Sequence, residues 1–242
     1  MDRREFVKKL AIGTGCLVLL PTVTACSGSR EATKEEPTPT EPTEPTPLAE
    51  PEPPKPEEPE EEIAAVPTVK PDDWDPIAYN KERGLAGAIP ETYHDEITGE
   101  KGDTDHLGKH LPYIPKDVKA KMVPAGFIAL MWGDPEKGYA KHPNAEPNES
   151  NNNEGHWYNW IRLRKAVEGE AEELQSAYDG WPKVGDDATG KYAAQGGGDI
   201  TADGGKNTIY LAALPSNVKP GDTVRIHAHC LTHGEYVDFI TV

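Results

Sequence analysis

The chain of 242 residues carries 42 acidic and 25 basic side chains, which gives a net charge of −17 at pH 7. No basic patch is present that would neutralise phosphates, so nucleic acid is excluded as a partner. Two of the three cysteines lie within the first 26 residues, which leaves Cys230 as a single thiol and rules out a disulfide bond within the remainder of the chain.

Residues 1–26 are expected to be an export signal. Paired arginines at residues 3–4 are followed by Phe-Val-Lys at residues 6–8, a pattern typical of twin-arginine signals. The apolar run at residues 10–23 is broken by glycine and proline and is too short for a transmembrane helix. It runs into Val-Thr-Ala-Cys, which resembles a bacterial lipobox. We therefore expect lipidation of Cys26 and an extracytoplasmic protein anchored to a bacterial membrane.

Residues 27–75 are expected to form a disordered acidic spacer. Twelve of the 24 prolines lie between residues 37 and 71, and the segment holds 15 acidic against 4 basic side chains. Proline and like-charge repulsion keep such a segment extended, and it has too few apolar side chains to build a core. We place the folded domain at residues 76–242, which is long enough for one hydrophobic core.

This domain is predicted to be all-β. Short apolar or alternating runs separated by Gly- and Pro-containing turns predict strands that pack as a β-sandwich. The runs lie at residues 125–132, 157–164, 207–214, 222–230 and 236–242. We also expect a short helix at residues 168–178 and a Gly- and Asp-rich loop at residues 180–205.

Seven of the eight histidines lie between residues 106 and 233. Cys230 and His233 form a Cys-x-x-His pattern at the end of a strand, which can turn a thiolate and an imidazole toward one metal ion. The histidines three and one residues before Cys230 share a strand face that Cys230 does not. Because a single histidine is usually a surface residue, four of the eight are expected on the surface: His94, His106, His227 and His229.

Four short motifs occur in order between residues 108 and 234. They are Gly-Lys-His-Leu-Pro at 108–112, His-Pro-Asn at 142–144, His-Trp-Tyr-Asn-Trp-Ile-Arg-Leu at 156–163 and Cys-Leu-Thr-His-Gly at 230–234. Together they resemble the superoxide reductase family, which includes neelaredoxin and desulfoferrodoxin. Each motif is only moderately specific, but the order of all four is that of the family.

The resemblance implies an immunoglobulin-like β-sandwich with one mononuclear non-haem iron. It implies four imidazoles in a plane and an axial thiolate as ligands: His110, His142, His156, His233 and Cys230. It also implies that superoxide is reduced to hydrogen peroxide at an open sixth position, with electrons from a donor protein. Lys109 is the candidate for attracting superoxide and supporting protonation.

The sequence departs from the family pattern in two places. Gly108 stands where the family commonly has a glutamate, whose role is therefore absent or is taken by another residue, with Glu100-Lys101 as one candidate. An asparagine-rich insertion at residues 148–153 lengthens the link between two of the histidines and could cover the open position.

Two other functions remain open. A cupredoxin-like electron carrier also ends in Pro-Gly-Asp, a strand, Cys-x-x-His and a closing strand. Such copper sites use two histidines, one cysteine and usually an axial methionine, and here no methionine follows Cys230. The remaining alternative is a lipoprotein that binds or senses iron without turnover.

Overall fold

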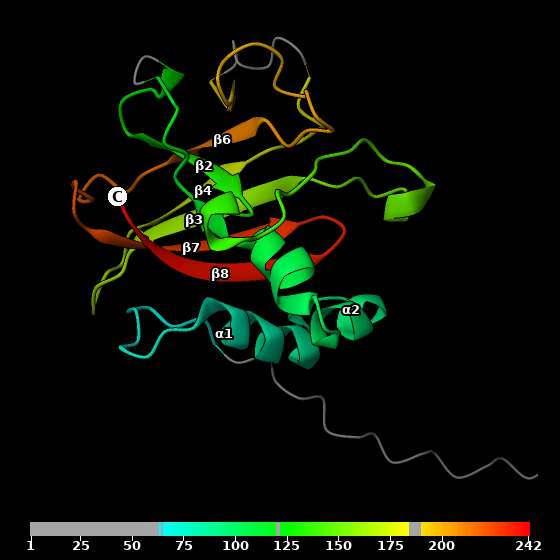
Figure 1. The fold of residues 1–242 in the computed structure, drawn as a ribbon. Coiled ribbons are helices and arrows are strands. Elements are labelled where there is room, and N and C mark those ends of the chain that lie inside the picture. Colours follow the sequence, from blue (N-terminus) through cyan, green and yellow to red (C-terminus); the bar gives the residue numbers. More distant parts are fainter. Residues whose placement is uncertain (1–62, 64, 120–121, 184–189) are drawn as a thin grey trace, which may run out of the picture. The chain divides into compact units, whose positions relative to one another are not determined.

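The computed structural model describes residues 63, 65–119, 122–183 and 190–242 (Figure 1). The chain divides into two units, Met1–Lys55 and Pro56–Val242, and every described residue belongs to the second. The predicted signal peptide, Cys26 and most of the predicted spacer lie outside the described residues. Among the helices that are described, none has the length and apolar character needed to cross a lipid bilayer.

The described part of the domain is built on two four-stranded antiparallel sheets. The first has the order β1-β2-β6-β5, with β1 (Pro112–Tyr113), β2 (Phe127–Trp132), β6 (Thr208–Ala213) and β5 (Tyr192–Ala194). The second has the order β4-β3-β7-β8, with β4 (Glu173–Ala177), β3 (Tyr158–Lys165), β7 (Thr223–Cys230) and β8 (Gly234–Thr241). The expectation of a mostly β domain is confirmed.

Apolar side chains from both sheets form one core. Alternate residues of a strand point to opposite faces, so each central strand contributes every second side chain to the core. The buried core includes these residues of the four central strands: Ile128, Leu130 and Trp132 of β2; Tyr158, Ile161 and Leu163 of β3; Tyr210 and Ala212 of β6; Val224, Ile226, Ala228 and Cys230 of β7. Cys230 is thus a core residue at the end of its strand.

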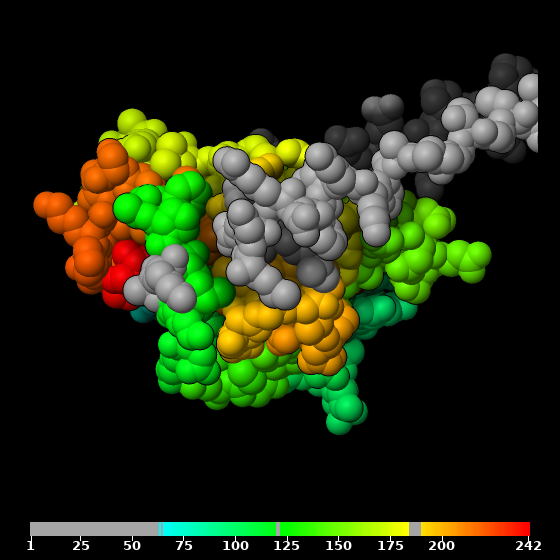
Figure 2. All heavy atoms as spheres, turned by 90° about the horizontal axis from the view of Figure 1, so that it is seen from above, coloured from blue at the N-terminus to red at the C-terminus, as the bar shows by residue number. Residues whose placement is uncertain are grey.

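The first sheet is also covered on its outer face. There the segment before β2 packs Val118, Met122 and Val123 against buried side chains of β2 and β6. This segment forms part of the green surface in Figure 2. The connection between β2 and β3 contains two short 3₁₀ turns, η6 (Pro135–Lys137) and η7 (Glu149–Asn151).

A helical segment at residues 76–110, not predicted from the sequence, lies beside β8 (Figure 1). It comprises α1 (Pro76–Arg83), η1 (Gly84–Ala88), η2 (Glu91–Tyr93), α2 (His94–Thr98), η3 (Gly102–Leu107) and η4 (Gly108–His110). Asp75 caps α1 by accepting hydrogen bonds from the backbone N–H groups of Ile77 and Ala78. Ile97 and Leu107 pack against Tyr236 of β8, which fixes this segment on the second sheet.

A side chain from α1 occupies the outer edge of β8. In the described part of the chain β8 is the last strand of its sheet, and its outer edge has no strand beside it. The Asn80 Nδ2–H group donates to the Val237 carbonyl at 2.7 Å, and Asn80 Oδ1 accepts from the Val237 N–H at 2.8 Å. The buried amide therefore provides at Val237 the two hydrogen bonds that a neighbouring strand would provide.

Packing on the domain begins before residue 76, the boundary expected from the sequence. The Trp74 indole N–H donates to the Asp238 carboxylate at 2.9 Å, and its ring packs edge-on against Phe239. Arg225 donates to the carbonyl of Pro67 at 3.3 Å. Residues 67–74 thus contact the second sheet, although they were expected to belong to the spacer.

One predicted element is wrong, and one predicted loop is incomplete. Residues 173–177, expected in a helix, form β4, where alternate side chains are exposed and the backbone pairs with β3. In this segment exposed and less exposed side chains alternate, and the edge of β3 offers hydrogen-bonding partners. Together these outweigh the preference of the glutamates and the leucine for a helix. The predicted loop 180–205 contains β5, whose three residues are all buried.

Candidate metal centre

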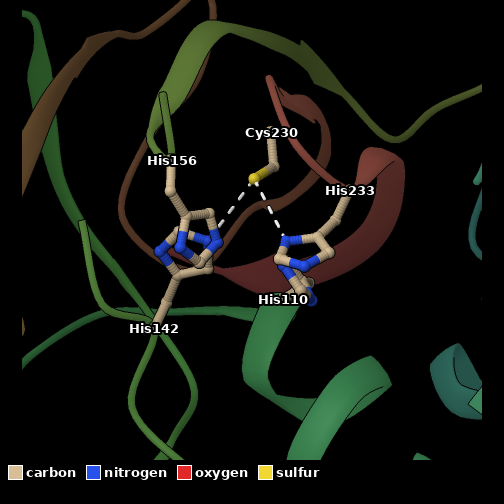
Figure 3. A group of neighbouring side chains, drawn as sticks. All are labelled: His110, His142, His156, Cys230 and His233. Atoms are coloured by element: carbon tan, nitrogen blue, oxygen red, sulfur yellow. Dashed lines mark hydrogen bonds between the residues drawn. The ribbon is translucent and has the colours of Figure 1, made fainter. Parts of the chain in front are cut away.

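Five buried side chains from separate segments converge beside the end of β7 (Figure 3). Their possible ligand atoms all lie within 4.8 Å of one another: one nitrogen each from His110, His142, His156 and His233, and the sulfur of Cys230. Each of the five side chains is buried. All five ligands implied by the family resemblance are thus brought together.

His110 ends the helical segment, and its orientation is set by the preceding turn. Its Nδ1 lies 2.7 Å from the His106 carbonyl, so Nδ1 carries the proton and donates it. This leaves the lone pair on Nε2, which lies 3.1 Å from Nδ1 of His233. A backbone acceptor of this kind is the usual way in which proteins fix the tautomer of a metal-binding histidine.

The structure also explains the glycine two residues before His110. A Cβ atom on Gly108 would lie 2.3 Å from the Tyr139 ring and 2.7 Å from the Asp103 carbonyl. Neither neighbour is the flexible end of a long side chain, so a glutamate does not fit at this position. Glycine at position 108 is therefore required by local packing.

His142 and His156 are held by a short antiparallel bridge. Ala145 and His156 exchange backbone hydrogen bonds of 3.0 and 2.9 Å, and the His142 N–H donates to the Trp132 carbonyl at 3.1 Å. The asparagine-rich insertion connects the two sides of this bridge. It returns to the centre at Gly155, whose carbonyl accepts from the Thr232 hydroxyl at 2.6 Å.

Cys230 and His233 are placed by the tight turn between β7 and β8. Cys230 pairs with Gly234 across this turn, and the Leu231 N–H donates to the Trp157 carbonyl at 3.1 Å. The cysteine sulfur lies 3.6 Å from His142 Nε2 and 3.7 Å from His233 Nδ1. The turn therefore brings the thiol and one imidazole to the other histidines.

Burial keeps the imidazoles neutral. Desolvation lowers the pKa of all four histidines, in the case of His156 to about 3, so their lone pairs are available near neutral pH. Burial raises the pKa of the Cys230 thiol to about 12, although backbone N–H groups of His233 and Thr232 act in the opposite direction. A bound cation would stabilise the thiolate in this pocket.

The polar atoms of this cluster fit a metal ion better than they fit one another. His156 Nε2 is buried and has no hydrogen-bond partner among the described residues, which is rare for a native side chain. Neutral nitrogens facing a thiol offer several lone pairs and few protons. Imidazole and thiolate are suitable ligands for iron, copper and zinc, and these five residues could bind such an ion.

Hydrogen bonds and ring contacts from neighbouring residues hold two of the cluster histidines. The Tyr236 ring stacks on His110 with a centroid distance of 4.3 Å and an angle of 8°, and its hydroxyl donates to the His233 carbonyl at 3.1 Å. His106 Nε2 lies 3.1 Å from the same hydroxyl, and His106 Nδ1 lies 3.0 Å from the Glu96 carboxylate. Tyr236 and His106 therefore connect two ligands to each other and to the helical segment.

The amide of Asn144 lies close to His142 and is fixed by two other contacts. Its Oδ1 accepts from the Tyr210 hydroxyl at 2.7 Å, and its Nδ2–H group donates to the Gly205 carbonyl at 2.7 Å. Asn144 acts to raise the pKa of His142, against the larger effect of burial.

Lys109 is partly exposed and is electrostatically coupled to the cluster. Its positive charge lowers the pKa of every one of the five side chains. Burial lowers the pKa of Lys109 itself, while the nearby Cys230 sulfur acts to raise it. The Glu100-Lys101 pair, the alternative source of charge, is exposed.

The expectation that four other histidines lie on the surface is wrong for two of them. His106 and His227 are buried. His227 pairs with Glu235 at 2.9 Å and stands edge-on to Trp160. His94 and His229 are partly exposed.

The supporting roles of His106 and Tyr236 were not predicted from the sequence. The separation of four residues between His106 and His110 is a helical spacing, which could have suggested that the two lie on one side of a helix. The Tyr236 contact spans 130 residues to His106 and leaves no local signal.

No family model, no curated protein and no solved structure matches the chain.

Proposed function

We propose that this chain is a superoxide reductase-like iron protein with an immunoglobulin-like fold. The observation that supports this most strongly is the convergence of four neutral imidazoles and one cysteine within 4.8 Å. Iron bound there would supply one electron to superoxide, which takes up two protons and leaves as hydrogen peroxide. A donor protein would then return one electron.

The protein contributes charge and exclusion of water in this proposal. Burial keeps the four histidines neutral, so the protein adds only the thiolate charge to that of the ion. Lys109 adds a positive charge beside the cluster, which attracts a small anion and is most effective at low ionic strength. Its ammonium group is also a proton source for the reduced oxygen species.

The number of converging side chains favours iron over copper. A blue-copper centre needs two histidines and a cysteine with a weak axial ligand, and a structural zinc site needs four ligands. Here a fifth residue, His156, turns a buried and unpaired nitrogen into the cluster. A purely iron-binding lipoprotein would have the same ligands, but it gives no role to the cation at Lys109.

The first test compares ligand variants. We expect His156→Ala to lower iron affinity by more than the roughly 10- to 100-fold that is typical for losing a residue that merely orients a ligand. It should also shift the thiolate-to-iron absorption of the oxidised protein, and Cys230→Ser should abolish that band. Metal analysis and optical spectra of the purified protein measure both effects.

His94→Ala is the matched control, since His94 lies outside the cluster and its ring, within the described part of the chain, hydrogen-bonds only to the backbone carbonyls of Gly84 and Ile89. An intense blue copper band that survives His156→Ala would contradict the iron site and support a cupredoxin. If superoxide decays no faster with the iron-loaded protein than without it, the binding or sensing alternative takes its place.

In Lys109→Ala, superoxide capture should slow at low salt with unchanged iron content.

We further propose that the protein is exported and anchored through Cys26. The twin-arginine pattern and the lipobox support this, and two acyl chains suffice for stable attachment at about 0.8 kcal/mol per buried CH₂ group. Cys26→Ala should release the protein from membranes in a fractionation experiment. A wild-type protein found only in the soluble fraction would contradict the anchor.

A further inference from the structure

The outer face of the second sheet carries an aromatic and cationic patch directly behind Cys230. Its members are Trp160 and Arg162 of β3, Gln175 of β4 and His229 of β7. Trp160 lies opposite His229 across the β3–β7 pair, and Arg162 lies opposite Gln175 across the β3–β4 pair. Their strand neighbours Ile161 and Ala228 point into the core, so these four side chains point away from it. We call this group the Trp160 patch.

The members of the Trp160 patch are ordered by contacts with one another. The rings of Trp160 and His229 are stacked at an angle of 11° with centroids 5.6 Å apart, and the Arg162 guanidinium lies 4.5 Å from the Trp160 ring centroid. Arg162 Nε donates to Gln175 Oε1 at 2.8 Å. Trp160, Arg162 and His229 are partly exposed, so the ordered group is accessible to a partner.

The patch is positive on an acidic chain. Among the described carboxylates near it, Glu173 pairs with Arg225 and Glu235 pairs with Arg83, while Glu154 acts electrostatically on His229. The contacts of Arg162 within the described residues are with a neutral amide and an aromatic ring, which leave its charge uncompensated. A chain of net charge −17 thus offers a local attraction for anions.

His229 connects this patch to the candidate metal centre by covalent bonds. It is adjacent in sequence to Cys230, and the strand sends the imidazole outward and the thiol inward. The His229 ring is held by Asn159, whose Oδ1 lies 2.7 Å from Nδ1. A single peptide unit therefore links a partly exposed ring on the outer face of the sheet to a sulfur atom in the cluster on its inner face.

We infer that the Trp160 patch is the surface on which an acidic one-electron donor protein docks and from which electrons reach the metal. This inference rests on the proposed function. One electron leaves the reduced donor, passes by way of Trp160, His229 and the bonds to Cys230, and reduces the oxidised metal, while no proton or covalent bond is exchanged. Small, weak interfaces are typical of redox partners, and Trp and Arg are enriched where partners bind. Opposite charges on the two partners raise the association rate and orient the encounter.

Binding is tested first with an anion that undergoes no redox change, so that the result does not depend on iron. Hexacyanocobaltate(III) is titrated into isotope-labelled protein at low salt and followed by NMR. The indole N–H resonance of Trp160 and the backbone resonances of residues 160–162 and 229 should shift. Shifts confined to residues around Lys109, or absent altogether, would overturn the docking surface.

Electron transfer is then measured by stopped flow with the reduced, iron-loaded protein. Hexacyanoferrate(III) is the anionic oxidant and tris(phenanthroline)cobalt(III) is the cationic one, because transfer out of the centre follows the same route as transfer into it. Arg162→Gln should slow the anionic reagent about threefold at low salt and should not slow the cationic one. Trp160→Leu should slow both reagents, and Trp160→Phe should restore part of the rate.

Lys116→Gln removes one exposed positive charge that pairs with Glu136 beside the other sheet, and should leave both rates unchanged. Iron content and the oxidised spectrum are recorded for every variant.

Unchanged rates in Arg162→Gln and Trp160→Leu with normal iron sites would overturn the route while leaving the metal centre intact. A rate that falls only in Lys109→Gln would place electron transfer on the side of the cluster where Lys109 lies. Absence of iron binding would contradict the proposed function instead, and the NMR titration would still decide the docking surface.

Discussion

At the level of single side chains, neighbouring groups set the protonation and the position of His110. Its proton stays on Nδ1 because the His106 carbonyl accepts it, which leaves the lone pair on the Nε2 atom that faces His233. The Tyr236 ring and hydroxyl hold His110 and the His233 backbone together. Such contacts reduce the reorganisation needed when a metal binds.

Tyr236→Phe tests this support. The ring remains, while the hydroxyl bonds to the His233 carbonyl and to His106 are lost. We expect metal affinity to fall about 10-fold with little change in fold, measured by competition with a chelator. Tyr113→Phe is the control, because within the described residues that hydroxyl hydrogen-bonds only to the Met131 sulfur. Equal affinities in the two variants would show that the hydroxyl has no positioning role.

Glu235 gives a pH-dependent prediction. His227, followed by Arg83, holds the pKa of this carboxyl at about 2, against about 4.3 in an unfolded chain. Because the folded pKa is the lower one, the stabilisation is complete above about pH 5 and is lost as the pH falls toward 2. Its size is modest, since the side chain is 35% exposed.

Glu235→Gln should therefore lower the free energy of unfolding at pH 7, and the difference from the wild type should shrink at pH 3. Denaturant unfolding at the two pH values measures this. Glu136→Gln, which breaks an exposed pair with Lys116, should have little effect at either pH. A Glu235→Gln deficit that is as large at pH 3 as at pH 7 would contradict the ion-pair explanation.

The five cluster residues were identifiable from sequence because each lies in a short linear motif. Cys230 and His233 are three residues apart, and His142 begins the His-Pro-Asn motif. His106 and Tyr236 were missed because their contacts join segments far apart in the chain. The burial of His227 was missed for a related reason. His227 hydrogen-bonds to Glu235, and Glu235 in turn pairs with Arg83 of the distant helix α1.

Among the strands and helices, the pattern of short apolar or alternating runs between Gly- and Pro-containing turns was the informative signal. It predicted β2, β3, β6, β7 and β8 to within a few residues. It failed at β4, where a glutamate-rich segment with helical propensity pairs with a free strand edge. The helical segment could not be predicted in this way, because its turns are short, irregular and dependent on packing against Tyr236.

The β7–β8 turn depends on a glycine directly after His233. Gly234 has φ +83°, and a Cβ atom there would lie 2.2 Å from the Ala88 carbonyl oxygen. Gly221 has a similar φ of +93°, but a Cβ atom added to it would meet no atom within 4 Å among the described residues, so a substitution there incurs the backbone penalty alone.

We expect Gly221→Ala to cost about 1 kcal/mol of unfolding free energy, and Gly234→Ala to cost more than about 3 kcal/mol. Only Gly234→Ala should also weaken metal binding, because the turn carries Cys230 and His233 on its other side. Chemical denaturation and metal titration distinguish the two variants. Equal losses of stability would show that the contact with Ala88 is easily relieved.

For the described domain as a whole, the packed body extends N-terminal to residue 76. The Trp74 indole donates a hydrogen bond to the buried Asp238 carboxylate. Burial raises the pKa of this carboxyl, and the hydrogen bond from Trp74 offsets part of that rise. A fragment comprising residues 76–242 should therefore be less stable than one comprising residues 63–242, by about 2 kcal/mol. Thermal or denaturant unfolding of the two fragments measures the difference. Equal stability would return the boundary to residue 76.

The pairing of Asn80 with Val237 also bears on how copies of the protein behave toward one another. An uncovered strand edge is a template to which an identical strand can add, and repeated addition leads to aggregates. A chain that began after Arg83 would retain all five cluster residues and the whole of β8, but it would present the Val237 N–H and carbonyl unpaired. The amide of one asparagine thus closes this position of the strand edge to an identical strand, independently of the chemistry at the other end of the same helical segment.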